Sequence, residues 1–135
     1  MTSRLNPYVH MRNNAREALD FYKSVFGGEL QVMPFGDMAH DPSEKNLVMH
    51  GQLDTPSGFT LMVSDTPASM DYKPVAGMTV SLSGDDDAAL RGYWTKLSAG
   101  ATIPQPLEKA PWGDSFGMLI DKFGTPWLVN IAGQR

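Results

Sequence analysis

The residues of this sequence that are best suited to chemistry lie two apart on one predicted strand. His50 and Gln52 belong to the segment NLVMHGQLDT, in which polar and apolar side chains alternate. Because neighbouring side chains of a strand point to opposite faces, His50 and Gln52 share one face. The apolar side chains of the opposite face are those of Leu47, Met49 and Leu53. If that apolar face packs on a helix, His50 and Gln52 point into a cavity.

A histidine in this position supports two interpretations. An imidazole ring exchanges protons near neutral pH, so His50 could act as an acid–base catalyst or hydrogen-bond a substrate. Alternatively, His50 is a buried ring that is satisfied by a structural partner. The sequence leaves both interpretations open. His10, which shares a face with Tyr8 in the segment NPYVHMR, is a second candidate for substrate binding.

Four further residues complete the predicted substrate site. Met62 and Ser64 alternate with apolar side chains in the segment FTLMVSD, which follows the strand of His50. Trp112 and Asp114 flank a glycine just before another predicted strand. An exposed indole can cover an apolar ligand, although Trp112 could equally be a structural wedge. Asp114 could instead do no more than form a turn.

The composition limits the partners and the compartment. The 135 residues are 41% apolar and 19% charged, as in an ordinary globular domain. The formal net charge of −4 indicates neither nucleic acid nor an anionic membrane as a partner. The chain contains no cysteine, which excludes disulfides and thiolate metal sites. It has no apolar stretch near the ~20 residues of a membrane span and no signal-peptide core, so we expect a cytoplasmic protein.

The elements that position these residues are predicted to occur twice in the same order. Each half of the chain has the pattern strand–helix–strand–strand–strand, with helices near residues 15–26 and 86–98. Asn13 or Asn14 is the expected N-cap of the first helix, and Gly27-Gly28 its end. We therefore expect one domain, 1–135. Its predicted parts are module one at about 5–66, a linker at about 67–76 and module two at about 77–132.

This order of elements resembles the glyoxalase/bleomycin-resistance superfamily, also called the vicinal oxygen chelate proteins, and within it the PhnB-like branch. The motifs that carry the resemblance are NNAREALDFYKSVFGGEL, VMHGQL, LMVSD and WGDSFGMLIDKFGTPWLVNI. The resemblance implies an α+β fold in which two βαβββ modules form a half-open barrel around a cavity, with the helices outside. It also implies a homodimer, and it includes a histidine at the position of His50.

The resemblance provides a test for a metal site. Metal-dependent members place His, Gln or Glu on the first strand of each module and Glu on the last, and their ion acts as a Lewis acid. In this sequence the position four residues after Gly124 is Leu128, and no His or Glu occurs near Gly77 and Met78. A divalent ion needs at least three nitrogen or oxygen ligands from the protein. We therefore expect no standard metal site and no required cofactor.

The expected function is the binding of a small organic molecule by a protein that lacks the usual metal triad. The alternative is a lyase, isomerase or other enzyme of the superfamily that acts on a small oxygenated metabolite, with His50 and a divalent metal near His10. A methyltransferase is not expected. A methyl-donor site of the usual kind needs a glycine-rich turn after the first strand of a parallel sheet, and this sequence contains no G-x-G.

Overall fold

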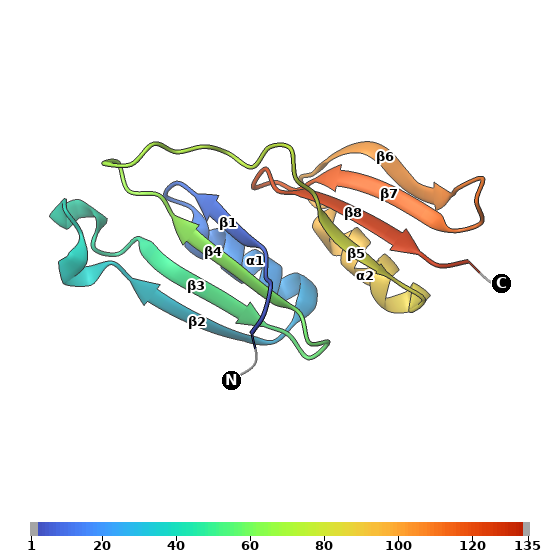
Figure 1. Cartoon of the computed structure of the whole chain (residues 1–135), viewed down its shortest axis with the longest axis horizontal. Coiled ribbons are helices and arrows are strands. Elements are labelled where there is room, and N and C mark those ends of the chain that lie inside the picture. Colours follow the sequence, from blue (N-terminus) through green and yellow to red (C-terminus); the bar gives the residue numbers. More distant parts are fainter. Residues whose placement is uncertain (1–2, 134–135) are drawn as a thin grey trace. The chain divides into compact units, whose positions relative to one another are not determined.

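Two modules with the same order of elements make up the computed structural model, which describes residues 3–133 (Figure 1). They divide between Pro74 and Val75. The elements of module one are β1 (Tyr8–Met11), α1 (Ala15–Phe26), β2 (Glu29–Pro34), two 3-10 turns (Gly36–Met38 and Pro42–Glu44), β3 (Val48–Asp54) and β4 (Thr60–Asp65). Those of module two are β5 (Val80–Gly84), α2 (Asp87–Leu97), β6 (Thr102–Lys109), β7 (Ser115–Ile120) and β8 (Pro126–Ile131).

Each module contains one four-stranded mixed sheet. The strand orders are β1-β4-β3-β2 and β5-β8-β7-β6, so the last strand of each module lies beside its first. That pair of strands is parallel in both modules, and the remaining pairs are antiparallel. The predicted α+β class and the repeated βαβββ pattern are thereby confirmed, and neither sheet closes on itself.

Helix α1 forms where the sequence predicts it, but a different residue binds its first turn. Its buried stripe follows helical spacing: Ala15, Ala18, Leu19, Tyr22, Val25 and Phe26. Asn14 occupies the N-cap position without a side-chain hydrogen bond. Instead, Asp65 Oδ1 accepts from the backbone N–H of Ala15 at 3.0 Å, and Asp65 Oδ2 accepts from that of Val48 at 3.0 Å. The predicted N-cap position is therefore confirmed, but its predicted side-chain hydrogen bond was wrong, because Asp65 on a strand remote in sequence supplies the acceptor.

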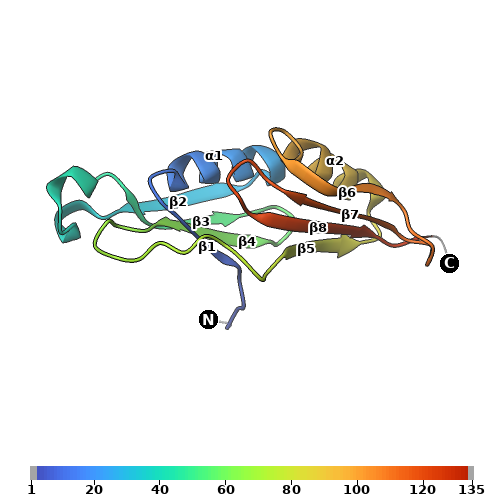
Figure 2. The same cartoon turned by 90° about the horizontal axis from the view of Figure 1, so that it is seen from above.

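The core of module one lies between α1 and one face of its sheet (Figure 2). The strand side chains in this core are those of Val9, Met11, Leu53, Leu61 and Val63. Gly51 lets the helix approach the sheet, because a Cβ at this position would collide with Leu19 Cδ1.

The alternation of faces along β3 holds for most of the strand, but not at Val48. Met33 pairs with His50 and Pro34 with Val48, so the register passes over Met49. Val48 is buried at 2% exposure, although strict alternation would place it on the more exposed face of His50 and Gln52. A bulge interrupts the regular alternation of side chains, which explains the difference.

Module two repeats this arrangement with α2 on one face of its sheet. Its buried core consists of Leu82, Leu90, Leu97, Leu119, Trp127, Val129 and Ile131. A turn that begins at Asp121 stabilises the end of this core. The Asp121 carboxylate accepts from the backbone N–H groups of Phe123 and Thr125 and from Trp127 Nε1 at 2.8 Å. This turn therefore fixes the buried indole at the start of β8.

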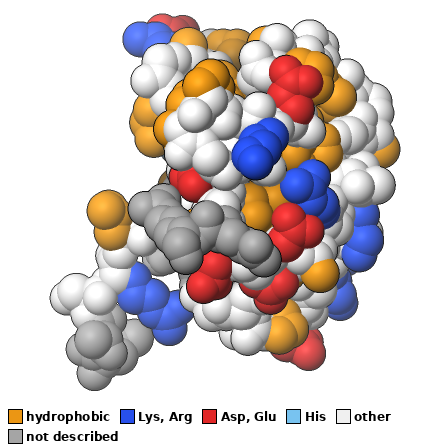
Figure 3. Space-filling model, turned by 90° about the vertical axis from the view of Figure 1, so that its right-hand side faces the viewer, with side chains coloured by type: hydrophobic (Ala, Val, Ile, Leu, Met, Phe, Trp, Pro, Cys, Tyr) orange, Lys and Arg blue, Asp and Glu red, His pale blue; other side chains and the backbone are white. Residues whose placement is uncertain are grey.

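Charged side chains of both signs are intermixed on the surface that Figure 3 shows. This mixture agrees with 11 basic and 15 acidic residues in the chain and does not form a field of one sign. Within residues 3–133, no helix has the length and apolar character needed to cross a membrane.

Candidate functional site

Five of the predicted site residues share the face of the module-one sheet that lies opposite α1, here called the open face. Direct cross-strand partners on this face are Tyr8 with Met62, His10 with Ser64, and Gln52 with Met62. Directly opposed residues of paired strands place their side chains on the same face. The register therefore brings together the predicted residues His10, His50, Gln52, Met62 and Ser64.

Tyr8 joins the two histidines into one ring cluster, the Tyr8–His10–His50 cluster. The Tyr8 hydroxyl and His50 Nδ1 form a hydrogen bond of 2.8 Å. The Tyr8 ring is stacked on His10, with ring centroids 5.0 Å apart and an angle of 16° between the planes. It meets His50 edge to face at 5.4 Å. Tyr8 thus fixes the orientation of one imidazole by a hydrogen bond and of the other by stacking.

Each imidazole of the cluster is held through the same ring atom. His10 Nδ1 lies 3.1 Å from Ser64 Oγ, as His50 Nδ1 lies against the Tyr8 hydroxyl. A neutral imidazole has one donor and one acceptor nitrogen, and both hydroxyl partners can either donate or accept. The Nε2 atoms of His10 and His50 can consequently present either a donor or an acceptor to a bound molecule. His10 is exposed and His50 is half-buried, so a ligand can reach both rings.

Gln52 points to a separate polar group at the end of the β3–β4 hairpin. Its Nε2 donates to both oxygens of Asp54, at 3.2 and 3.0 Å, and Thr60 Oγ1 donates to Asp54 at 2.9 Å. These bonds lower the pKa of Asp54, and the bond from Gln52 has a larger effect than the bond from Thr60. Arg4 lies 3.6 Å from the same carboxylate. The predicted partnership of His50 and Gln52 is therefore one of a shared face, while the amide of Gln52 is bonded to Asp54.

The other two predicted site residues lie in module two, on the connection between β6 and β7. Trp112 is 63% exposed, and its ring meets Phe116 at 5.8 Å. Asp114 is 8% exposed and accepts from the Gly133 N–H at 2.9 Å and from Asn130 Nδ2 at 3.1 Å. These contacts give Asp114 a role in closing the turn, whereas Trp112 is accessible to a ligand.

The donor set of the open face does not match the needs of a divalent ion. Across residues 3–133, no group of three or more His, Asp or Glu side chains is arranged to hold a metal. His10 and His50 would offer two nitrogens, and both rings already use one nitrogen for a hydroxyl partner. Leu128, at the place where the resemblance predicts a last-strand ligand, has no donor atom. The residues present therefore do not fit the metal centre of the metal-dependent members.

The register shows that the cluster is specific to module one. The pairs Val9–Val63 and Gly51–Val63 correspond to Leu82–Val129 and Gly117–Val129 in module two. The residues next to these positions correspond in the same way. Tyr8 corresponds to Ser81, His10 to Ser83 and His50 to Phe116. The repeated fold thus carries imidazoles on one sheet and small hydroxyls with an aromatic ring on the other.

Tyr8 is the functional candidate that the sequence prediction did not include. The pattern of NPYVHMR already places Tyr8 and His10 on one face, and this signal was available. The partnership with His50 was not, because it depends on β4 lying between β1 and β3. Phe116 was missed for a similar reason, since its contact with Trp112 depends on the path of the β6–β7 connection.

Comparisons with known proteins agree with this architecture. The family model described as 3-demethylubiquinone-9 3-methyltransferase matches residues 3–130. The crystal structure of PA1353 from Pseudomonas aeruginosa is similar with a TM-score of 0.85 and 35% identity, over 98% of this chain and 100% of that one. A putative 3-demethylubiquinone-9 3-methyltransferase, PhnB protein, from Bacillus cereus has a TM-score of 0.77 and 22% identity, over 96% and 100%.

A more distant structure shares the fold. The glyoxylase/bleomycin resistance protein/dioxygenase domain from Frankia sp. EAN1pec has a TM-score of 0.69 at 14% identity, over 100% of this chain and 94% of that one. The family match, the repeated modules and these structures agree with one another. The chain belongs to the family described as 3-demethylubiquinone-9 3-methyltransferase, and it shares its fold with structures of the glyoxalase/bleomycin-resistance superfamily.

Proposed function

We propose that this protein binds a small organic molecule on the open face of module one, at the Tyr8–His10–His50 cluster. The observation that carries the proposal is the 2.8 Å bond between Tyr8 and His50, made while the same tyrosine is stacked on His10. Three polar rings are already held in fixed orientation on a sheet face, so little side-chain entropy is lost when a ligand binds. Preorganised donors and acceptors of this kind are typical of a binding site.

The chemistry of the cluster favours a ligand that carries oxygen. The two Nε2 atoms can donate to carbonyl or carboxylate oxygens or accept from hydroxyl groups. Met62 lies beside Tyr8 on the same face and offers a soft apolar surface next to these polar atoms. A small oxygenated metabolite with an apolar part therefore matches the site.

The Tyr8–His50 bond also favours a second candidate, an isomerase or lyase that moves a proton. His50 could take a proton from a substrate at Nε2 while Tyr8 stabilises the ring through Nδ1. Such acid–base chemistry uses only groups that are present in this chain. Metal analysis of protein purified without a histidine tag distinguishes between these possibilities. A stoichiometric divalent ion would favour an enzyme with an atypical metal site near His10, and metal-free protein would favour binding or proton chemistry by the cluster alone.

The family description names a methyltransferase, but the structure offers little support for such an activity here. The connection between β1 and α1, residues 12–14, contains no glycine, and the sheet is mixed rather than parallel. A methyl donor of the usual kind binds at a glycine-rich turn of a parallel sheet. We therefore include S-adenosylmethionine in the test below as a direct competitor to the proposal.

The proposal includes a homodimer located in the cytoplasm. β1 and β2 form the edges of the module-one sheet, and β5 and β6 those of the module-two sheet. Such edges can be covered by a second copy of the chain. Exposed apolar side chains would add to an interface, among them Leu5 at 99% and Met78 at 69% exposure.

Native mass spectrometry tests the binding proposal. The protein is incubated with a metabolite mixture that contains S-adenosylmethionine, and unbound molecules are removed by gel filtration. We expect the wild type to retain a small oxygenated molecule that His50→Ala loses and that His40→Ala retains. His40 is exposed in the loop after β2, so this matched variant removes an imidazole outside the cluster. Retention of S-adenosylmethionine would favour the methyltransferase, and equal retention by all three proteins would contradict the assigned site.

A further inference from the structure

Module two contains a pocket of about 310 Å³ at the end of the β6–β7 hairpin, and its lining differs from the histidine cluster of module one. Residues 105–116 supply every side chain that lines it. We propose that this pocket binds a planar aromatic molecule that carries one hydrogen-bond donor. The volume lies at the low end of the ~300–1,000 Å³ typical of ligand pockets, which favours a molecule of about two fused rings.

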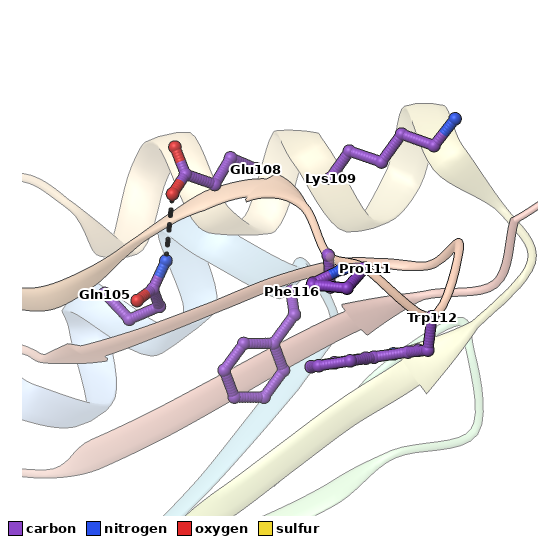
Figure 4. Close-up of a pocket in the computed structure, with 7 residues that line it drawn as sticks. Gln105, Glu108, Lys109, Pro111, Trp112 and Phe116 are labelled. Atoms are coloured by element: carbon purple, nitrogen blue, oxygen red, sulfur yellow. Dashed lines mark hydrogen bonds between the residues drawn. The ribbon is translucent and has the colours of Figure 1, made fainter.

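The aromatic wall of the pocket consists of Trp112 and Phe116, whose rings lie next to each other in Figure 4. Their centroids are 5.8 Å apart and their planes make an angle of 66°. The Trp112 ring is nevertheless 63% exposed, so much of its apolar surface faces water. A flat ligand laid against the indole would bury this surface and gain the additional attraction of aromatic contact.

The backbone of the hairpin holds Trp112 in place without the help of a ligand. Ala110 N–H donates to Asp114 O at 2.7 Å, and Gly113 N–H donates to Ala110 O at 3.0 Å. Gly113 has a φ of 101°, a left-handed conformation that favours glycine. The indole therefore projects from a closed turn, and a ligand need not order the loop in order to bind.

The polar wall of the pocket presents an acceptor. Gln105 Nε2 donates to Pro106 O at 3.2 Å and to Glu108 Oε1 at 3.2 Å, the second bond being drawn in Figure 4. These two bonds use both hydrogens of the amide. Both bonds are made by the amide nitrogen and leave the side-chain oxygen Oε1 of Gln105 available as an acceptor. A ligand N–H or O–H can satisfy this oxygen, and the two fixed bonds orient it in advance.

No residue of the Tyr8–His10–His50 cluster lines this pocket, so a ligand can bind here independently of the function proposed for module one. The experiment below follows the indole N–H signal of Trp112, which lines the pocket. Failure of ligand binding at His50 would leave this site unaffected, and the reverse also holds. Different measurements therefore test the two proposals.

The test uses two probes that differ only in the donor, 2-naphthol and 2-methoxynaphthalene, and follows the indole N–H signals of 15N-labelled protein. The chain has three tryptophans, and Trp112→Phe identifies the signal of Trp112. Trp127 is 2% exposed and bonded to Asp121, so its signal serves as an internal control. We expect 2-naphthol to shift the Trp112 signal saturably and to leave that of Trp127 in place.

The donor and the flat ring are then tested separately. In the wild type, 2-methoxynaphthalene should bind about fivefold more weakly than 2-naphthol, the effect of one lost hydrogen bond. Gln105→Leu should remove this preference, with the Trp127 signal reporting that the variant is folded. Decahydro-2-naphthol, which keeps the hydroxyl and lacks the flat ring, should give no saturable shift. An unmoved Trp112 signal, equal shifts at Trp112 and Trp127, or equal wild-type affinities for the two naphthalenes would overturn the proposal.

Discussion

Two aspartates of module one show how burial decides what a carboxylate does. Asp65 is 5% exposed, and its two oxygens accept from the first N–H of α1 and from the N–H of Val48. Asp54 is 41% exposed and accepts from the side chains of Gln52 and Thr60. The first joins three elements inside the protein, and the second has a pKa that its hydrogen bonds lower.

Replacing Asp65 by alanine should destabilise the fold strongly. The change leaves two buried backbone N–H groups without an acceptor, and we expect a loss of about 2–4 kcal/mol in the free energy of unfolding. Urea denaturation measures this loss. Asp37→Ala is the matched control, because Asp37 is exposed in the 3-10 turn Gly36–Met38 and its replacement should change stability by less than ~0.5 kcal/mol. Equal stability of both variants would show that Asp65 does not hold α1 in place.

The lowered pKa of Asp54 predicts a dependence of stability on acid. Because hydrogen bonds from Gln52 and Thr60 favour the ionised carboxylate, the unfolded chain binds more protons than the folded chain in acid. The contribution of Asp54 is therefore complete above the ordinary aspartate pKa of about 4 and is lost as the pH falls through the lower folded value.

Urea denaturation of wild type and Asp54→Asn from pH 6 to pH 3 measures this effect. We expect the stability advantage of the wild type to shrink as the pH falls. An advantage that stays constant or grows in acid would contradict the assignment.

At the scale of elements, each module uses a glycine where its helix crosses the sheet. Gly51 and Gly117 occupy corresponding places, each paired with a valine of the last strand of its module. A Cβ at Gly117 would lie 2.7 Å from Trp94 of α2 and 2.8 Å from Leu107 Cα. The close helix–sheet packing in both modules thus depends on the absence of a side chain.

Alanine at either of these strand glycines should cost about 1–3 kcal/mol in the free energy of unfolding, the usual effect of overpacking. Gly92 provides a control of opposite sign, because it lies within α2 and no atom is within 4 Å of its added Cβ. Gly92→Ala should stabilise the protein by about 0.5–1 kcal/mol through helix propensity. Thermal or urea unfolding of the three variants measures both effects, and a stable Gly51→Ala protein would show that the helix can move away from the sheet.

The sequence predicted the elements well because their signals are local. The apolar spacing within residues 15–26 and the glycines that follow are sufficient to place α1, whose observed bounds are the same. The acceptor for the first N–H of α1 could not be predicted, since Asp65 lies 50 residues beyond Ala15. The Tyr8–His50 bond spans 42 residues and depends on strand order. Periodicity shows which face a side chain occupies, but not which strand lies beside it.

At the scale of the whole molecule, one repeated fold carries two different surfaces. Module one presents the Tyr8–His10–His50 cluster, and module two presents the aromatic pocket of Trp112 and Phe116. Fold membership alone does not choose a function, since the chemistry belongs to the side chains that the fold carries. Because the residues at corresponding strand positions differ, we propose a different ligand for each module.

The homodimer prediction belongs to this scale. At micromolar concentration, sedimentation equilibrium should give twice the mass of the chain, because a second copy would cover exposed sheet edges and apolar side chains. Dilution into the nanomolar range is the control that measures the dissociation constant. A single species with the mass of the monomer throughout would count against the dimer.

Imidazole NMR spectra test whether a ligand binds at the Tyr8–His10–His50 cluster. The chain has three histidines, so single variants assign all ring signals. On addition of the molecule captured in the mass-spectrometry experiment, we expect saturable shifts of the His10 and His50 Nε2 signals with one common affinity, while the His40 signal stays unchanged. Binding that leaves the signals of His10 and His50 in place would contradict the proposed site.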